Sequence, residues 1–262
     1  MQANYKNWVP RGMVVGFGSG TAIALGISLA IYFTQKEANR VAHLVWFGIA
    51  LLVAVVLFCF FAWSFVAHLV FSYRGHIRLS QKIISHVADA ATIKDGQTGL
   101  DIGCGSGALT IAVAKRHPNA KMVGLDRWGK DYASFSQALC YNNAKAEGVN
   151  NVEFVQGDAI ALAYPDESFD FVTSNYCYHN ISGYDKQQLL RETFRVLRKG
   201  GTFAIHDLMG KSRYGDMDAF EKELKAVGFK DVKRIRTDGV WLSSFWAFLI
   251  GLRHSTLLVG TK

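Results

Sequence analysis

Two long runs without a charged residue dominate the first third of this 262-residue chain. The first covers residues 14–33 and the second covers residues 44–71. About 20 apolar residues are enough to cross the hydrocarbon core of a bilayer. A signal peptide followed by a buried core helix is the alternative, but residues 34–37 (Thr-Gln-Lys-Glu) stand where small residues would mark a cleavage site. The pattern therefore predicts a transmembrane helical hairpin within residues 1–72.

The pattern changes after residue 72. We expect the second helix to continue through residues 64–82 beyond the membrane, so that residues 73–95 form a stalk or N-terminal helix. From residue 96 to 262, short apolar runs alternate with helix-forming stretches, which predicts an α/β domain with a doubly wound, mostly parallel, seven-stranded, Rossmann-like sheet. The expected strands are 98–102, 121–125, 152–156, 169–174, 202–206, 232–236 and 256–260, and the expected early helices are 108–116, 132–147 and 186–197.

Helix-terminating and helix-starting residues support this division. Pro118 follows the first helix of the domain, and a pair of glycines at 200–201 precedes the fifth strand. Asp218 with Glu221 has the spacing of a capping box, and Gly228 is placed to end the helix that this box would start. These residues predict one further helix between the fifth and sixth strands.

Basic residues are concentrated near the two apolar runs. The chain has a net charge of +8, and residues 1–82 carry +6 of it. Positive charge beside apolar spans marks the cytoplasmic side of a membrane or attracts anionic lipid headgroups. The positive net charge of the chain therefore does not indicate a nucleic-acid-binding face. The outer ends of the two runs carry more cations than the connecting turn, which predicts that both termini and the α/β domain are cytoplasmic. The outer cations are Lys6, Arg11, Arg74, Arg78 and Lys82, and those of the turn are Lys36 and Arg40.

Gly12, Gly16 and Gly20 repeat every four residues along the first apolar run. Small residues at this spacing let another helix approach closely. The partner is either the second run of the same chain or the same stripe of a second copy, which would give a homodimer. The sequence leaves both interpretations open.

The four cysteines, Cys59, Cys104, Cys140 and Cys177, form no Cys-x-x-Cys pair and have no metal-ligand spacing. They fit a reducing compartment without a disulfide framework, and we expect no metal. A catalytic thiol at Cys177 is the less favoured interpretation, because cysteine is commonly a small buried apolar residue.

The segment Leu100-Asp101-Ile102-Gly103-Cys104-Gly105-Ser106-Gly107 is the strongest candidate for chemistry. Glycine lets the backbone approach a ligand closely, and the helix that starts at Ala108 offers free N–H groups. Asp126 ends the next expected strand, and Asp158 follows the third one within a Gly-Asp-Ala sequence. Ligands of open α/β sheets bind at the carboxyl ends of the strands. The pattern therefore predicts a nucleotide-type cofactor site.

This ordered set, completed by the Arg-x-Leu-x-x-Gly-Gly sequence of residues 195–201, resembles the class I S-adenosylmethionine-dependent methyltransferases of the type 11/UbiE-like group. The resemblance covers about residues 80–262. It implies that the glycine loop packs against the methionine part of S-adenosylmethionine, that Asp101 orients its ammonium, and that the acids after strands two and three bind ribose and adenine. The implied cofactor-binding residues are Asp101, Gly103, Cys104, Gly105, Gly107, Asp126, Arg127, Trp128, Asp158, Ala159 and Asn175.

An NAD-type Rossmann domain is the alternative to this family. Its Gly-x-Gly-x-x-Gly fingerprint requires a third glycine at position 108. That position holds alanine. The pyrophosphate-binding geometry of a dinucleotide site is therefore not favoured, and no oxidoreductase signature follows.

Candidate acceptor-site residues follow the fourth strand, in Asn175-Tyr176-Cys177-Tyr178-His179-Asn180. His179 is a candidate base near neutral pH, and Tyr176 or Tyr178 is a candidate for cation–π contact with an acceptor. The alternative for each residue is simple packing under the loop. His206 and Asp207 are a second candidate pair, but neighbours on a strand face opposite ways. The loop lacks the Asn-Pro-Pro-Tyr tetrad of amino-methylating nucleic-acid enzymes, so we expect no nucleic-acid substrate.

Residues 239–252 contain two tryptophans and no charge. They are too few to span a bilayer but suit its interface; a hydrophobic hairpin packed on the sheet or on the stalk helix is the alternative. The sequence as a whole predicts an integral-membrane methyltransferase of a lipophilic acceptor, such as a quinone, a phospholipid amine, an isoprenoid or a hydrophobic thiol. A tethered enzyme with a soluble acceptor and a non-catalytic membrane sensor of the cofactor are the alternatives.

Overall fold

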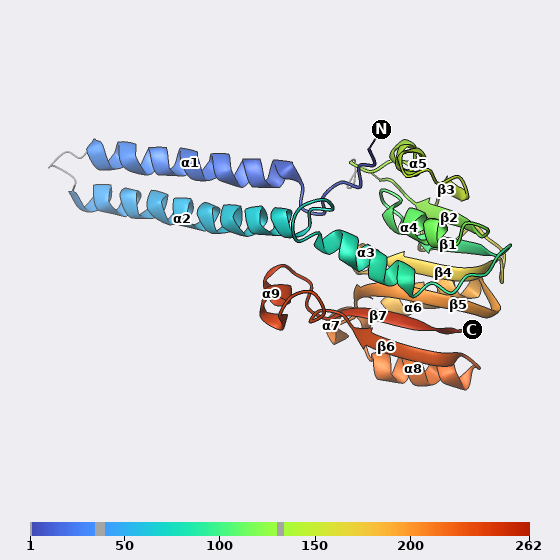
Figure 1. Cartoon of the computed structure of the whole chain (residues 1–262). Coiled ribbons are helices and arrows are strands. Elements are labelled where there is room, and N and C mark those ends of the chain that lie inside the picture. The colour runs from blue at the N-terminus through green and yellow to red at the C-terminus, as the bar shows by residue number, and fades with distance from the viewer. Residues whose placement is uncertain (1, 35–39, 130–133) are drawn as a thin grey trace. The chain divides into compact units, whose positions relative to one another are not determined.

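The computed structural model describes residues 2–34, 40–129 and 134–262 (Figure 1). These residues divide into two compact units. The helical unit comprises Lys6–Gln81. The sheet unit comprises Lys82–Lys262 together with the N-terminal residues that end at Tyr5.

Two long helices, α1 (Arg11–Phe33) and α2 (Arg40–Val70), form most of the helical unit. Both are long and apolar enough to cross a membrane, by length and composition. They lie side by side, as the hairpin prediction requires (Figure 1). On α1 the small residues Thr21, Ala24 and Ser28 are buried. The hydroxyls of Thr21 and Ser28 donate to backbone carbonyls four residues earlier, so that no polar group of these side chains is left unpaired.

The predicted glycine stripe meets α2 at one position only. A Cβ on Gly20 would lie 3.5 Å from Leu57, whereas a Cβ on Gly12 or Gly16 would meet no atom of the described residues within 4 Å. Gly18, which the stripe does not include, lies close to Phe61. Of the two partners that the sequence left open for this stripe, α2 therefore contacts it only at Gly20.

The predicted continuous stalk is interrupted. The second apolar helix ends at Val70, and a separate helix, α3 (Leu79–Asp89), begins after a short connection. Arg78, immediately before α3, has a φ of 50°, a left-handed conformation that cannot continue a right-handed helix. The new helix still lies within residues 73–95, where an N-terminal helix was expected.

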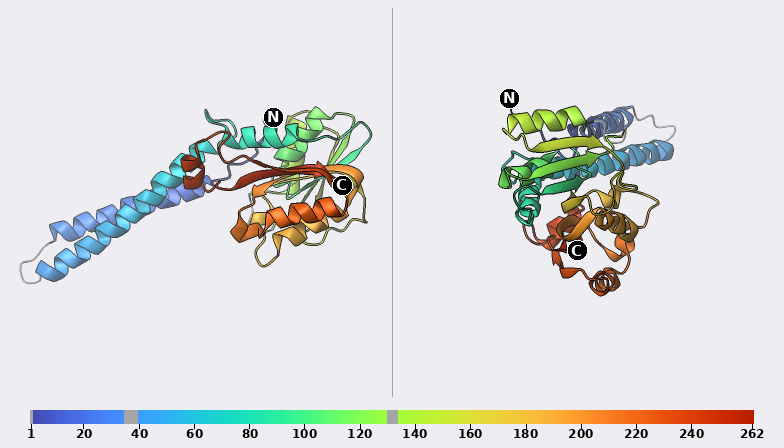
Figure 2. Two further views of the ribbon diagram at one scale, coloured as in Figure 1. Left: turned by 90° about the horizontal axis from the view of Figure 1, so that it is seen from below. Right: turned by 90° about the vertical axis from the view of Figure 1, so that its right-hand side faces the viewer.

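A seven-stranded sheet in the order β3-β2-β1-β4-β5-β7-β6 forms the core of the sheet unit. The first five strands pair in parallel, and β7 is antiparallel to both β5 and β6. Helices cover both faces (Figure 2), which confirms the doubly wound, mostly parallel fold. The strands are β1 (Thr98–Ile102), β2 (Lys121–Asp126), β3 (Val152–Gln156), β4 (Phe169–Asn175), β5 (Leu197–Leu208), β6 (Lys230–Arg236) and β7 (Ser255–Thr261). The helices are α4 (Ala108–Arg116), α5 (Gln137–Ala146), α6 (Lys186–Arg195), α7 (Lys211–Tyr214), α8 (Met217–Ala226) and α9 (Ser244–Leu249), with a 3₁₀ turn, η3 (Tyr178–Asn180).

The central strands are buried on both faces, which explains their continuous apolar sequences. Leu100, Ile102, Val172 and Ile205 have no exposed surface. The edge strand β6 is instead mostly exposed, with Val232 as its one buried residue. Because β1 and β4 are neighbours, the direction in which successive strands are added reverses between them, and a ligand crevice is expected at their carboxyl ends.

Several element boundaries differ from the prediction because local caps were misread. The predicted capping box at Asp218 is wrong: Asp216 caps α8, since its side chain accepts from the backbone N–H groups of residues 218 and 219. Asp218 instead pairs with Arg234. In α5, Ser136 is the N-cap and accepts from the N–H of Leu139, so the helix begins later than predicted; the first two residues of the predicted helix lie outside the described residues.

Arg195 of the Arg-x-Leu-x-x-Gly-Gly sequence joins the end of α6 to the loop before β4. Its guanidinium donates to the carbonyls of Leu162 and Tyr164, at 2.9 and 2.8 Å, and pairs with Glu192 and Asp166. The hydrogen bond from Arg195 lowers the pKa of Glu192. This motif residue is therefore a structural clamp within the fold.

We expect Arg195→Ala to destabilise the sheet unit by about 1–3 kcal/mol, because two carbonyls lose a charged donor. For a domain of this size, that corresponds to a fall of several degrees in the melting temperature of the full-length protein in detergent. The control is Arg191→Ala, since Arg191 pairs with Glu223 where both side chains are more than 40% exposed. Such a surface pair contributes about 0–1 kcal/mol. Equal shifts for the two variants would contradict the clamp.

Candidate functional site

The glycine turn between β1 and α4 leaves one position open. Gly103, Gly105 and Gly107 all have positive φ, at 74°, 56° and 78°. A side chain on Gly103 would collide with Cys177, and one on Gly107 would press on the ring of Phe154. A Cβ on Gly105, in contrast, would meet no atom of residues 2–34, 40–129 and 134–262 within 4 Å. The turn is therefore packed at its two ends and open in the middle, where a ligand can approach the backbone.

Asp126, at the end of β2, holds this turn in place. Its carboxylate accepts from the backbone N–H of Gly105 and from that of Trp128, both at 2.8 Å. The indole N–H of Trp128 in turn donates to the carbonyl of Gly105 at 2.9 Å. Each carboxylate oxygen has a second acceptor direction, so Asp126 can still accept from a ligand hydroxyl. Arg127, beside it, is exposed, and Trp128 is half-buried.

Asp101 lies behind the glycine turn rather than on its surface. Its side chain is 1% exposed and accepts from the hydroxyl of Thr110 at 2.6 Å. Burial raises the pKa of Asp101 to about 7, and the hydrogen bond from Thr110 opposes this rise. The neighbouring thiol of Cys104 is also buried, and its pKa is raised by burial and by Cys140. Cys104 is therefore a packed thiol, whereas Asp101 changes charge near neutral pH.

Asp158 follows β3 at the same edge of the sheet. One of its carboxylate oxygens accepts from the N–H of Ile160 at 3.0 Å. The side chain is half-buried, while the next residue, Ala159, is buried in the hydrophobic core. Asp126 and Asp158 thus lie at the carboxyl ends of two neighbouring strands, on the side where the glycine turn opens.

The first residues of the chain cover part of the same site, which no pattern in the sequence predicts. The N–H of Asn4 donates to the side chain of Asn143 in α5 at 2.7 Å, and Asn143 donates back to the carbonyl of Asn4. The hydroxyl of Ser106, in the glycine turn, donates to the carbonyl of Tyr5. Ala3 and Tyr5 are buried, and Figure 1 places the N-terminus beside α5. The N-terminal segment is therefore part of the wall of the glycine turn.

Asn175 is the last residue of β4 and pairs with His206 of β5 in the sheet. Its amide oxygen is 2.8 Å from Nδ1 of His206, whose Nε2 is 2.7 Å from the hydroxyl of Thr237. Burial lowers the pKa of His206 to about 3, so this histidine is neutral. Tyr176 packs on the ring of His206, with centroids 4.7 Å apart, and its hydroxyl is 2.7 Å from that of Ser255. Asn175 therefore lies in a network with His206 that also orders Tyr176.

The 3₁₀ turn η3 separates Tyr178 from His179. Tyr178 has no exposed surface, and its hydroxyl bonds to Thr193 at 2.5 Å in the hydrophobic core. The structure therefore does not place Tyr178 among the groups that an acceptor could reach. Cys177 packs against Gly103, and burial raises the pKa of its thiol, so it is not a ready nucleophile.

His179 is oriented by Asp207, at the end of β5. Nδ1 of His179 is 2.5 Å from a carboxylate oxygen of Asp207, and the backbone N–H of His179 donates to the other oxygen. The carboxylate, which has no exposed surface, also accepts from the N–H of Leu208 and from the hydroxyl of Tyr214. Burial and the proximity of Asp207 raise the pKa of Tyr214, which keeps this hydroxyl a donor. The expectation that His206 and Asp207, as strand neighbours, face opposite ways agrees with their partners: His206 bonds to Thr237, and Asp207 bonds to His179.

This arrangement fixes which nitrogen of His179 holds the proton. A carboxylate accepts only, so Nδ1 carries the hydrogen and Nε2 keeps a lone pair. The His179 side chain is 18% exposed, and its ring stands perpendicular to that of Tyr176 at a centroid distance of 6.0 Å. The hydrogen bond to Asp207 therefore fixes the orientation of the His179 ring. Within the described residues no group of His, Cys, Asp and Glu side chains could hold a metal ion.

Comparisons with known proteins agree with this architecture. The chain is 31% identical over 133 residues to a demethylmenaquinone methyltransferase of Geobacillus stearothermophilus, which covers 50% of this chain and 52% of the relative. It is 37% identical over 118 residues to the demethylmenaquinone methyltransferase of Lactobacillus johnsonii, covering 43% and 44%. The chain thus spans about half the length of the curated relatives that it matches.

Solved structures share the fold at low identity. The crystal structure of the [4+2]-cyclase SpnF has a TM-score of 0.55 and 19% identity, and covers 73% of this chain and 85% of its own. The phosphoethanolamine N-methyltransferase 2 of Haemonchus contortus, solved with S-adenosyl-L-methionine, has a TM-score of 0.52 and 18% identity, covering 72% and 54%. A family profile described as "Methyltransferase domain" matches residues 93–237, which is more than half of the chain. The chain therefore belongs to the methyltransferase-domain family.

Proposed function

We propose that this protein is an S-adenosylmethionine-dependent methyltransferase that acts on a lipophilic acceptor at a membrane. The observation that carries the proposal is that no described side chain or backbone atom fills the space beside Gly105, whose N–H is held by Asp126 at the end of β2, while Asp158 follows the neighbouring strand β3. The family of the chain and the names of its relatives support the same reaction class.

The residues at this edge fit the three parts of the cofactor. Asp126 retains acceptor directions for the ribose hydroxyls, and Asp158 retains one oxygen for the adenine amino group. The open glycine turn leaves room for the methionine part, and Asp101 lies near enough to the turn to attract its ammonium in the ionised form. S-adenosylmethionine supplies a methyl group on a positively charged sulfur. The protein's task is to align the acceptor with that methyl group and to exclude water.

We assign to His179 the role of removing a proton from the acceptor. With its hydrogen held on Nδ1 by Asp207, the Nε2 lone pair can take a proton from an acidic O–H or C–H group of the acceptor. An acceptor that loses a proton fits this base better than one that is already a neutral amine or an ionised thiol. A quinol ring, as in the substrates for which the curated relatives are named, is such an acceptor. Tyr176, packed beside His179, is placed to line the same space.

The two apolar helices place this chemistry at a membrane in our proposal. They pass the length and hydropathy requirements for spanning, and the distribution of basic residues favours cytoplasmic termini and a cytoplasmic sheet unit. The test of the whole proposal is to supply a labelled methyl donor to membranes with and without the protein. We expect label in a lipid-extractable product, identified by its mass. Label that stays in the aqueous phase would point to a soluble acceptor, and cofactor binding without any labelled product would point to a sensor.

We expect Asp126→Ala to weaken the binding of S-adenosylhomocysteine by at least about tenfold, because a charged hydrogen-bond partner is removed. Asp126→Asn keeps one acceptor oxygen, so its affinity for S-adenosylhomocysteine should lie between that of Asp126→Ala and that of the native protein. Isothermal titration of the full-length protein in detergent measures both. Glu153→Ala is the control, since Glu153 is an exposed acid on β3 that pairs with Lys121. An unchanged titration for Asp126→Ala would overturn the ribose assignment.

The raised pKa of Asp101 predicts a pH dependence of cofactor binding. Since this pKa is about 7, Asp101 is largely neutral near pH 6 and becomes a carboxylate as the pH rises. An ionised Asp101 attracts the ammonium of the cofactor, so affinity should increase from about pH 6 to about pH 7.5. Asp101→Asn should remove the increase while the titration of the ligand itself is unchanged. The same slope in both proteins would show that another group is responsible.

We expect His179→Ala to lower kcat by about 10²- to 10⁴-fold on an acceptor that must lose a proton, because the general base is removed. Asp207→Asn should cause part of this loss, because an amide no longer fixes the hydrogen on Nδ1. Both variants should bind S-adenosylhomocysteine normally, which separates the base from the cofactor site. Native kcat in His179→Ala, with a correctly folded protein, would exclude the assigned role.

A further inference from the structure

The connection between β6 and β7 carries an exposed apolar surface. Around the six-residue helix α9, Val240, Phe245, Trp246 and Phe248 are each more than half exposed, and Leu249 is 38% exposed. We call these five residues the α9 patch. Other exposed large hydrophobic residues of the sheet unit, such as Tyr141, Tyr184 and Val227, are scattered over separate elements. Single exposed apolar residues are normal on a protein surface, whereas a contiguous patch marks a contact site.

The rest of the connection is well packed, so the exposure is not due to a loosely attached loop. Ala247 and Ile250 face inward and are 1% and 7% exposed. Trp241 stands edge-on to the ring of His86, with centroids 5.4 Å apart. The N–H of His254 donates to the carboxylate of Asp238 at 3.1 Å, which joins the two ends of the connection. A fixed helix therefore presents Phe245, Trp246 and Phe248 to its surroundings.

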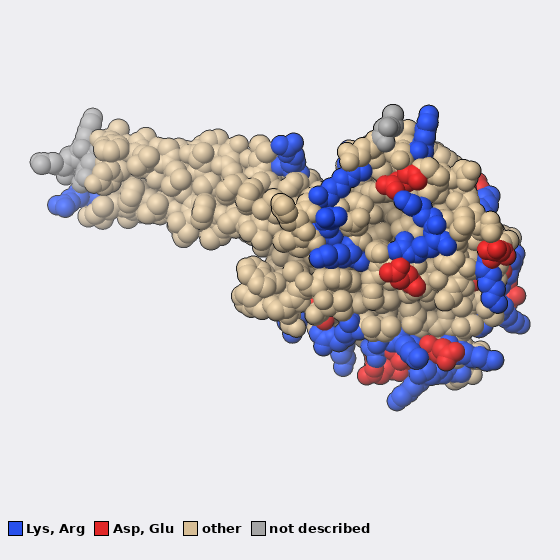
Figure 3. Space-filling model, in the orientation of Figure 1, with Lys and Arg blue, Asp and Glu red and all other residues tan. Residues whose placement is uncertain are grey.

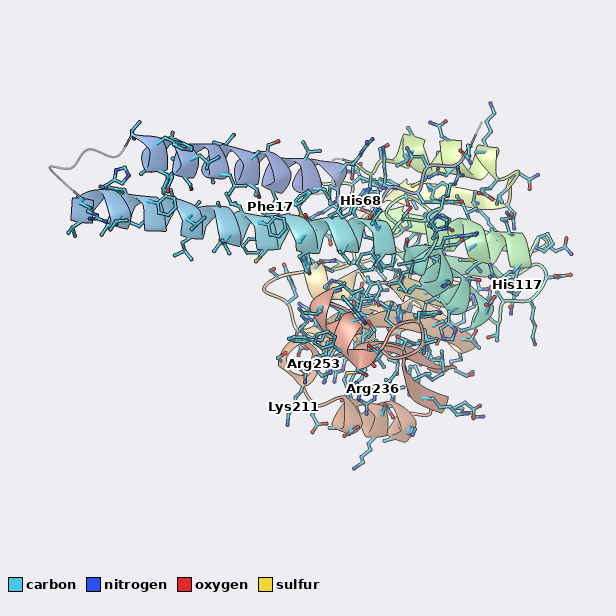
Figure 4. The ribbon with its side chains drawn as sticks, turned by 60° about the vertical axis from the view of Figure 1, so that its left-hand side comes forward. Phe17, His68, His117, Lys211, Arg236 and Arg253 are labelled. Carbon is cyan, nitrogen blue, oxygen red and sulfur yellow. The ribbon has the colours of Figure 1, made fainter. Side chains whose placement is uncertain are left out.

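Basic side chains surround the α9 patch. Arg253 lies over the ring of Phe248, 5.7 Å from its centroid. Lys211 and Arg213 are exposed on α7, and Figure 4 labels Lys211 and Arg253. The segment before α7 is joined to the connection by the hydrogen bond from the N–H of Met209 to the carbonyl of His254. None of the ion pairs among the described residues involves these three cations. In Figure 3 the surface over α9 carries no charge, and blue side chains lie beside it. Exposed aromatic residues with basic side chains beside them match the interface of an anionic bilayer.

The base of this connection is bonded to the candidate acceptor site. Thr237, where the connection starts, is 2.7 Å from Nε2 of His206, and Ser255, where it ends, is 2.7 Å from the hydroxyl of Tyr176. The backbone also joins these two residues, since the N–H of Thr237 donates to the carbonyl of Ser255. The α9 patch and the acceptor-site loop are therefore two ends of one hydrogen-bonded assembly.

We propose that the α9 patch inserts into the interface of an anionic lipid bilayer, as a second membrane contact made by the sheet unit itself, and that it opens the acceptor site to that lipid surface. The delivery of an acceptor rests on the proposed function, whereas the insertion does not. A helix of this length cannot span a bilayer, so the contact is interfacial.

The insertion is tested on the full chain reconstituted into vesicles of phosphatidylcholine, alone or mixed with phosphatidylglycerol. Cysteine at position 245 (Phe245→Cys), in a Cys59→Ala background that removes the exposed native thiol, carries an environment-sensitive fluorophore. Val227→Cys is the matched control, since Val227 is 69% exposed and lies at the end of α8. We expect quenching by lipids with a nitroxide on the acyl chain at position 245 only, and stronger quenching with phosphatidylglycerol. Equal and weak quenching at both positions would overturn the insertion, whether or not the protein methylates anything.

The link to the acceptor site is tested by kinetics in the same vesicles. The variant combines Phe245→Ser, Trp246→Ser and Phe248→Ser, and the control combines Tyr184→Ser with Val227→Ser. With a naphthoquinol that bears a polyprenyl tail, we expect the KM of the variant to rise on the order of tenfold and that of the control to stay unchanged. With the tail-less naphthoquinol, both should match the native protein. Normal KM for both acceptors would overturn the delivery role, while no turnover by the native protein would instead contradict the proposed function.

Discussion

The carboxylate of Asp207 is completely buried, and the acceptor side of the structure is built around satisfying it. A buried carboxylate is costly unless hydrogen bonds replace the water that it loses. Here the donors come from three places in the chain: the backbone and ring of His179 in η3, the N–H of Leu208, and the hydroxyl of Tyr214 in α7. Each donor fixes the element that carries it. The requirement to satisfy one carboxylate therefore sets the path of the loop after β4, the position of α7 and the tautomer of His179.

Asp126 plays the corresponding part on the cofactor side, at lower burial. Its two oxygens bind the backbone of the glycine turn and of the segment after β2, so that a loop rich in glycine is held in one conformation. A flexible turn would lose more conformational entropy when a ligand binds, and holding it beforehand reduces that loss. The two acids are brought to one edge of the sheet because β2 and β5 both run parallel to the strands between them. The fold thus brings Asp126 and the pair of Asp207 and His179 to the same edge of the sheet.

The sequence predicted those parts of the site whose residues lie in one short segment next to a recognisable strand. The glycine turn, Asp126, Asp158 and His179 each follow a strand whose apolar residues mark its end, so their common edge could be inferred from the α/β pattern. The partners of these residues could not, since Asn4 and Asn143 are 139 positions apart and Tyr214 reaches Asp207 from a separate four-residue helix. The two tyrosines at 176 and 178 were equivalent in the sequence; only the 3₁₀ turn, which directs Tyr178 into the core, distinguishes them. The misplaced cap of α8 has the same origin, because Asp216 and Asp218 both suit the start of a helix and the choice depends on packing.

The acceptor loop, β5 and the α9 connection are joined by hydrogen bonds through neutral side chains. Because the pKa of His206 is lowered to about 3, its two nitrogens keep one donor and one acceptor role throughout the physiological range, and both are used, toward Asn175 and Thr237. A protonated His206 would donate from both nitrogens, so the hydroxyl of Thr237 would have to turn and accept from Nε2 where it now donates. Burial therefore keeps the network of Asn175, His206 and Thr237 neutral throughout the physiological range, and Tyr176 packs against a ring whose charge does not change there.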